Sequence, residues 1–225
     1  MSPHGLPALA LLEARVLGVL VEKQHTVPDT YPLTLNALVA GCNQKTSREP
    51  VLSASEAEVQ AAVDHLRTLT LIIESSGGRA MRYSHNVERV LQVPSQSVAL
   101  LAGLMLRGAQ TAGELRISCE RLHRFADISS VEAFLTELAD RPAGALVVEL
   151  SRQPGARENR WAHLLSGTPT AEPASAGASP DSIASDVAVG EFIALKDNVA
   201  RLENEIASLK ATVAKLCTAL GITPH

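Results

Sequence analysis

Residues 55–85 read "SEAEVQAAVDHLRTLTLIIESSGGRAMRYSH" and predict a helix followed by a β-hairpin. Ser55 precedes Glu58 by three residues, which is the spacing of a capping box at the start of an amphipathic helix. Two strand-like runs then flank the dipeptide Gly77-Gly78, which is typical of a tight hairpin turn. This helix-hairpin unit is the pattern from which the rest of the chain can be interpreted.

The unit occurs twice, each time after two further helical stretches. "ALLEARVLGVLVEKQ" and "LTLNALVAGCN" precede the first copy. "SVALLAGLMLRG" and "TAGELRISCERLH" precede the second copy, which consists of "SSVEAFLTELADR" and a hairpin around Pro154-Gly155. Ser129 and Glu132 repeat the capping-box spacing at the start of the later helix.

Three helices followed by a two-stranded ribbon are the plan of a winged helix-turn-helix domain. The predicted fold class is α+β, mainly α with small β-hairpins. We expect an N-terminal tail at residues 1–8 and two tandem winged helix-turn-helix domains at 9–93 and 94–166.

The remaining chain predicts a flexible linker at 167–189 and a coiled-coil helix at 190–220. The linker is rich in Ser, Ala, Pro and Gly, whereas the helix has apolar residues spaced alternately by three and four. Glu191 and Glu205 would face Lys196 and Lys210 of a second chain, so we expect a parallel homodimer. The alternative, a helix folded back on its own domain, needs a wider apolar stripe. The predicted dimer contacts are Phe192, Leu195, Val199, Leu202, Ile206, Leu209, Val213, Leu216 and Leu220.

The composition is that of a globular protein with an aliphatic core. Apolar residues make up 46% of the 225 residues and aromatic residues 3%, which favours helices packed on helices. The amino terminus lacks the basic start and cleavage site of a signal peptide. No stretch reaches the roughly 18 apolar residues of a membrane span. We therefore expect a cytoplasmic protein without membrane contact.

Catalytic and metal-binding motifs are missing from the sequence. Cys42, Cys119 and Cys217 lie far apart and form no CxxC pair, so each is expected to be a small, reduced, buried residue. Neither HExxH, nor a GxSxG elbow, nor a Walker-type phosphate loop occurs. We expect a protein that is not an enzyme and that uses no metal and no cofactor.

The charges argue against a DNA-reading third helix in either domain. Such a helix should present cationic or amide side chains near its start, because phosphates and base edges attract them. The first copy instead carries Glu56, Glu58 and Asp64, and the third helix of the second copy is acidic as well. The net charge of −4 provides no global field for a polyanion.

Cations do gather in the two hairpins, which would form the wings. Wing arginines are compatible with phosphate contact, although isolated surface arginines are commoner than binding sites. Trp161 is the only tryptophan and is expected to pack in the core. The candidate contacts to nucleic acid or a partner in the wings are Arg79, Arg82, Arg152, Arg157 and Arg160.

The segment "GCNQKTSREPV" at 41–51 is much longer than the three or four residues of a helix-turn-helix turn. In the structural alternative to binding, Asn43 caps the preceding helix, and Arg48 and Glu49 form local ion pairs. In either case we expect Val51 and Leu52 to reach the core. The candidate contacts to a nucleic acid or partner in this segment are Asn43, Gln44, Lys45 and Arg48.

Several strings together resemble the YceH family of bacterial proteins of uncharacterised function. They are "LNALVAGCNQKTSREPV", "SEAEVQAAVDHL", "LMLRGAQTAGELR" and "RWAHLL", and the resemblance covers residues 9 to 166. It implies a pair of winged-helix domains and a bacterial cytoplasmic source, but no activity.

Two functions follow as expectations. The favoured one is a homodimeric, non-enzymatic, DNA-associated regulator that binds through the wings and the 43–48 loop. The alternative is a protein-interaction scaffold without nucleic-acid binding, which would use the acidic third helices or the coiled coil.

Overall fold

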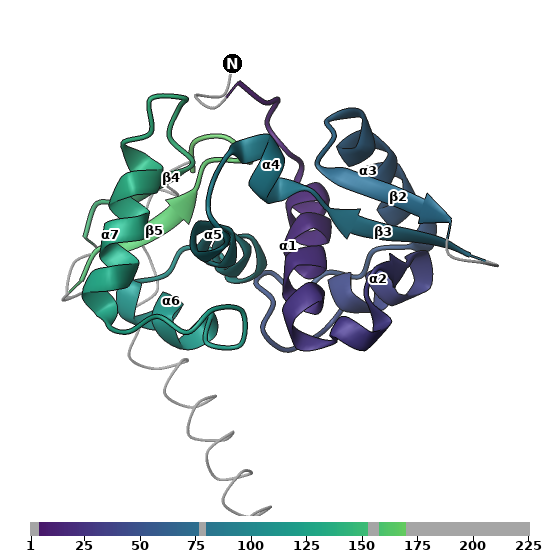
Figure 1. The fold of residues 1–225 in the computed structure, drawn as a ribbon, viewed down its shortest axis with the longest axis horizontal. Helices are drawn as coiled ribbons and strands as arrows, with labels where there is room; N and C mark the ends of the chain where they lie inside the picture. The colour runs from purple at the N-terminus through teal and green to yellow at the C-terminus, as the bar shows by residue number, and fades with distance from the viewer. Residues whose placement is uncertain (1–4, 77–79, 153–157, 170–225) are drawn as a thin grey trace, which may run out of the picture. The chain divides into compact units, whose positions relative to one another are not determined.

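The structure is a computed structural model that describes residues 5–76, 80–152 and 158–169, which form an α+β fold with small antiparallel sheets. Figure 1 shows the arrangement. The first half (5–93) contains α1 (Leu11–Thr26), the 3-10 turn η1 (Pro28–Thr30), β1 (Leu33–Thr34), α2 (Leu35–Cys42), α3 (Glu56–Thr68), β2 (Ile72–Ser76), β3 (Met81–His85) and α4 (Val87–Leu91). The second half (94–169) contains α5 (Ser95–Arg107), α6 (Ala112–Ser118), α7 (Ile128–Ala139), β4 (Val147–Leu150) and β5 (Arg160–His163).

Both halves follow the same pattern of strand pairing. In the first half, Glu74 of β2 pairs with Tyr83 of β3, and β1 pairs with the other side of β3. In the second half, Glu149 of β4 pairs with Trp161 of β5, and a single bridge from Gln110 pairs with the other side of Trp161. Tyr83 and Trp161 therefore occupy equivalent places. The expected order of three helices and a hairpin is present in each half.

The second helices of the two halves also correspond. The side-chain oxygens of Thr34 and Thr111 accept backbone N–H groups at the starts of α2 and α6. Cys42 and Cys119 lie at the opposite ends of these helices and are fully buried. Burial raises the pKa of these thiols to about 12 and about 11, so both are neutral, apolar side chains at pH 7, as expected. Cys217 lies outside the described residues.

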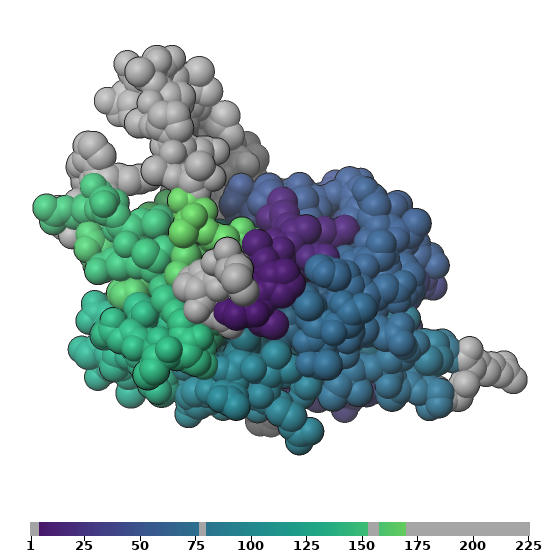
Figure 2. Space-filling model, turned by 90° about the horizontal axis from the view of Figure 1, so that it is seen from above, coloured from purple at the N-terminus to yellow at the C-terminus, as the bar shows by residue number. Residues whose placement is uncertain are grey.

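A single hydrophobic core joins the two halves. Residues 13–21 of α1 are all buried, and α1 packs on α5 so closely that a Cβ on Gly18 would lie 3.0 Å from Leu106. Figure 1 shows these two helices at the centre, with the hairpins on either side. The N–H of Leu9 donates to the carbonyl of Leu165 at 2.8 Å. Figure 2 shows this N-terminal segment, in purple, between the blue first half and the green second half.

The start of α3 agrees with the sequence, but the start of α7 does not. The Glu58 N–H donates to Ser55 Oγ at 3.3 Å, and the Ser55 N–H donates to the Glu58 carboxylate at 2.8 Å, which confirms the capping box. In α7 the cap is Asp127, whose carboxylate accepts the Ser130 N–H at 2.7 Å. The capping box predicted at 129–132 was wrong, because an aspartate that caps a helix equally well lies two residues earlier.

Other expectations differ by element. β1 and α4 were not predicted, because elements this short leave no periodic signal. Val51 is 56% exposed, so the expectation that it reaches the core was wrong. Trp161 is 9% exposed, which confirms that it packs in the core. Most of the predicted linker and all of the predicted coiled-coil helix lie outside the described residues. No helix in the described part of the chain is long and apolar enough to cross a membrane.

We expect acid to destabilise the fold through two equivalent histidines at the ends of β3 and β5. Burial lowers the pKa of His85 and of His163 to about 4, and for His85 the nearby His25 adds to the effect. An unfolded chain binds these protons near pH 6.5. Stability contributed by the neutral rings is therefore fully present above pH 6.5 and is lost as the pH falls towards 4.

The measurement is urea unfolding at pH 7 and pH 5. The free energy of unfolding should fall by on the order of 1–2 kcal/mol per histidine. The double variant His85→Gln/His163→Gln should lose most of this pH dependence. An equally steep loss of stability in that variant would contradict the assignment.

Candidate functional site

The base of the 41–51 loop is closed by one side chain. Asn43 follows α2 directly, and its N–H donates to the carbonyl of Val39 at 3.1 Å. Its side-chain amide donates to the Ala54 carbonyl at 2.8 Å and accepts the Ala54 N–H at 2.7 Å. Both hydrogen-bonding groups of the amide are thus used to hold the two ends of the loop together.

A buried ion pair fixes the middle of the loop to α1. Arg48 is 4% exposed, and its guanidinium donates to the two carboxylate oxygens of Glu22 at 3.0 and 2.6 Å. Its Nε donates to the Gly41 carbonyl at 3.1 Å. Burial by itself would raise the pKa of Glu22, but the hydrogen bonds and charges of Arg48 and Lys23 hold it below its usual value. Arg48 therefore pairs with α1 rather than with Glu49.

A second buried arginine supports the same loop from α1. Arg15 has no exposed surface and donates to the carbonyls of Cys42 at 3.2 Å and Pro50 at 2.7 Å. Gln44 accepts a hydrogen bond from Lys23 at 3.3 Å. Of the four candidate side chains in this loop, only Lys45 is exposed without a hydrogen bond to the described part of the chain.

The loop also contacts the second half of the protein. The Glu49 N–H donates to the Leu106 carbonyl at 2.8 Å. Arg107, at the end of α5, donates to Ser47 Oγ at 2.7 Å. Lys45, two residues before Ser47, is exposed in the same loop. The long segment therefore connects α1, α2 and α5.

The hairpin arginines lie in different environments. Arg82 is half-buried and donates to the carbonyls of Thr30 and Pro32 at 3.3 and 2.8 Å. Arg152 is exposed just after β4. Arg79 and Arg157 lie outside the described residues. The structure thus brings Arg82 against η1 and β1 and does not place it beside Lys45.

Arg160 shares a hollow with Arg107. Arg107 was not among the candidates predicted from the sequence. The hollow has a volume of about 330 Å³ and lies between α5, α6 and β5. Neither arginine forms an ion pair within residues 5–76, 80–152 and 158–169, and Glu114 is the one carboxylate among the described lining residues. In the sequence, Arg107 is marked only by its position at the end of a helix. Cations are common there because they interact favourably with the helix dipole, so this position does not indicate a binding site.

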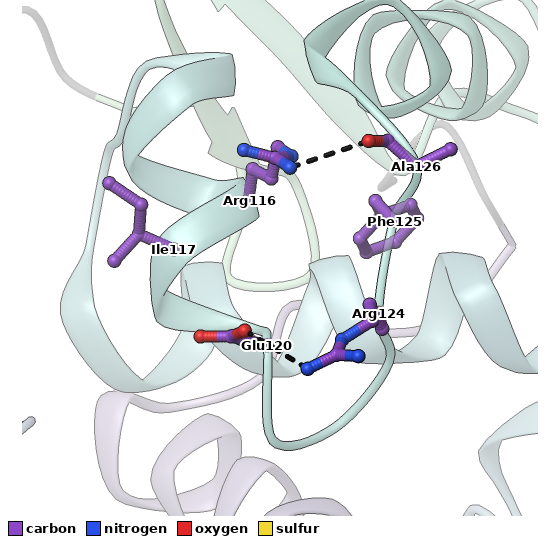
Figure 3. A pocket seen from close by; sticks show the side chains of 6 residues that line it. All are labelled: Arg116, Ile117, Glu120, Arg124, Phe125 and Ala126. Carbon is purple, nitrogen blue, oxygen red and sulfur yellow. Dashed lines mark hydrogen bonds and ion pairs between the residues drawn. The ribbon is translucent and has the colours of Figure 1, made fainter.

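A second hollow, of about 470 Å³, lies on the other side of α6 (Figure 3). Arg116 donates to the Ala126 carbonyl at 3.3 Å, and Arg124 lies 3.7 Å from Glu120. Figure 3 shows the ring of Phe125 between the two guanidinium groups. Ile117, which is 75% exposed, lines both hollows, so their cations belong to one surface. We call this surface the cationic edge and define it as Arg107, Arg116, Arg124 and Arg160.

We expect the buried ion pair, rather than the exposed lysine, to control stability. Arg48→Ala leaves the Glu22 carboxylate buried without its main partner and should lower the free energy of unfolding by about 3–5 kcal/mol. Lys45→Ala, in the same loop, should change it by less than about 0.5 kcal/mol. Urea unfolding followed by circular dichroism measures both values. A similar loss in the two variants would show that the loop does not depend on Arg48.

Comparisons with known proteins agree on one family. The family model DUF480, a protein of unknown function, matches residues 9–156. A UPF0502 protein of Dechloromonas aromatica is 61% identical over 205 residues, covering 91% of this chain and 94% of the relative. UPF0502 proteins of Burkholderia vietnamiensis and Burkholderia lata are 58% and 59% identical, covering 98% of this chain and 93% of each relative. The chain therefore belongs to the bacterial DUF480/UPF0502 family.

Proposed function

We propose that the protein is a non-enzymatic, tandem winged-helix protein of the bacterial cytoplasm that associates with nucleic acid through phosphate contacts. The supporting observation is the position of Arg107. It joins the 41–51 loop through Ser47 and shares a hollow with Arg160. Arg107 and Arg160 thereby lie on one surface beside the loop of the first half, although they are far apart in sequence. The assignment to the YceH family, which rests on sequence resemblance, is part of the same proposal.

The chemistry of the cationic edge suits a phosphate backbone better than base edges. Its members are four arginines, which bind phosphate oxygens without regard to sequence. The side chains that would read adenine, Asn43 and Gln44, already bond within the protein. The third helices offer carboxylates instead, among them Glu58 and Glu132. The proposed contact is therefore strongly dependent on salt and weakly dependent on sequence.

Binding to generic duplex DNA should weaken steeply as salt rises. Each phosphate contact adds about −0.9 to the slope of log affinity against log salt. The double variant Arg107→Ala/Arg160→Ala should reduce the magnitude of that slope by about 2. A mobility-shift titration between about 50 and 200 mM salt measures it.

A matched control for this titration is Arg67→Ala, because the Arg67 charge is already committed to Asp64 and Glu74. It should leave the slope unchanged. Thermal unfolding checks that each variant is folded. Absence of binding by the wild-type chain at about 50 mM salt, or equal slopes in all three proteins, would refute the nucleic-acid proposal.

Pairing of two chains through residues 190–220 is a further part of the proposal. The heptad pattern from Phe192 to Leu220 favours a parallel two-stranded coiled coil, and two linked copies would double the number of weak phosphate contacts.

Light scattering on the full chain and on a chain that ends at Thr170 tests the dimer. One chain has a mass of 23.8 kDa, so the full-length protein should show twice this mass in solution. The shortened chain should show the mass of a monomer. A shortened chain that remains a dimer would place the interface elsewhere. A full chain with the mass of a monomer would exclude the coiled-coil dimer.

A further inference from the structure

The third helix and hairpin of each half enclose a hollow at an equivalent position. In the first half it is lined by residues of α3, β2 and β3, including Asp64, Arg67 and Glu74. In the second half a hollow of about 550 Å³ lies between α7 and the β4–β5 hairpin, and we call it the acidic groove. The described residues that define its chemistry are Glu132, Ala139, Asp140, Glu149 and Trp161.

The two hollows can be compared residue by residue. The third helices can be aligned from their N-caps, and the hairpins can be aligned from their strand pairing. Arg67 and Ala139 each lie twelve residues after the N-cap of their helix, Ser55 and Asp127 respectively. Each directly follows a leucine whose carbonyl accepts an N–H from the residue before the next strand, at 3.0 Å in both halves. Ala139 therefore occupies the place of Arg67.

One carboxylate beside this place also corresponds. Glu74 and Glu149 lie in equivalent strands, and each pairs across the hairpin with an aromatic residue, Tyr83 or Trp161. In the first half, Arg67 forms ion pairs with Glu74 at 2.5 Å and with Asp64 at 3.2 Å. The first hollow thus contains its own guanidinium, held between two carboxylates.

The acidic groove lacks this internal cation. Its described lining has three carboxylates, Glu132, Asp140 and Glu149, and no lysine or arginine. Glu149 accepts a hydrogen bond from the Asn159 amide at 2.7 Å. None of the three forms an ion pair within the described ranges. The strand glutamate that binds a guanidinium in the first half has an alanine at the equivalent helix position in the second, and its described partner is the neutral Asn159 amide.

We infer that the acidic groove binds an arginine side chain from an extended segment of a partner protein, in the place that Arg67 fills in the first half. The occupant is fixed by charge complementarity. A guanidinium can bond two carboxylate oxygens at once and can lie against an aromatic ring, whereas an ammonium offers only a point charge. The groove also has apolar walls, from Ala139, Val147 and Leu164, which suit small apolar residues beside the arginine.

Trp161 makes the binding observable, because it is the only tryptophan of the chain and lines the groove. The probe is the capped peptide Ala-Ala-Arg-Ala-Ala, titrated into the full chain and followed by fluorescence and calorimetry. We expect saturable binding at one site per chain. The same peptide with citrulline in place of arginine should bind at least about tenfold more weakly, because it keeps the shape but loses the charge.

Two variants of the groove give the decisive comparison. Ala139→Arg supplies the missing guanidinium from within the chain and should weaken peptide binding at least about tenfold. Glu149→Gln should do the same by removing the carboxylate. Arg67→Ala should have the opposite effect, because it vacates the equivalent place in the first half and should raise the stoichiometry from one site to two.

Thermal unfolding establishes that each variant is folded, and if Ala139→Arg does not fold, Glu149→Gln and Arg67→Ala still decide. Absence of saturable binding to the wild-type chain would overturn the inference. Equal affinities of wild type, Ala139→Arg and Glu149→Gln would overturn it too, as would equal affinities for the arginine and citrulline peptides.

Discussion

The bidentate pair between Arg48 and Glu22 fixes the 41–51 loop, which bridges the two halves beside the packing of α1 on α5. Removing a guanidinium from water costs several kcal/mol, so such a group is retained only when its donors find partners. Arg48 finds them on α1 and at the end of α2, and Arg15 of α1 also binds carbonyls at both ends of the loop. With the loop fixed in this way, its backbone reaches the end of α5. A segment longer than a helix-turn-helix turn thereby becomes a bridge between the halves.

The duplication is visible in individual residues as much as in helices. Cys42 and Cys119, and His85 and His163, occupy matching places although the connections between them differ in length. The two halves differ in whether their charged side chains form ion pairs within the same half. The first half neutralises itself internally, through Arg48 with Glu22 and Arg67 with Glu74. In the second half, Arg107 and Arg160 near α6 and the carboxylates of the acidic groove form no ion pair within the described residues.

Patterns local in sequence predicted local structure well. Periodicity and the Ser55 capping box identified the helices and hairpins, because those signals depend on neighbours three or four residues away. The role of Arg48 was not predictable in the same way, because its partner Glu22 is 26 residues distant and an arginine in a polar loop looks like a surface contact. Arg107 was overlooked for the converse reason. Its significance comes from Ser47 and Arg160, which only the fold brings to it.

The cationic edge and the acidic groove of the second half favour ligands of opposite charge. The net charge of −4 is too small to steer a polyanion from a distance, so attraction arises only near the cationic edge, within about 8–10 Å at physiological salt. Over the same distance the carboxylates of α7 and β4 repel phosphate. A nucleic acid bound as proposed at the cationic edge would therefore have no favourable contact with the acidic groove, and the proposed arginine-bearing partner would have none with the cationic edge. The lining residues of the two surfaces do not overlap, so each can be occupied without displacing the other.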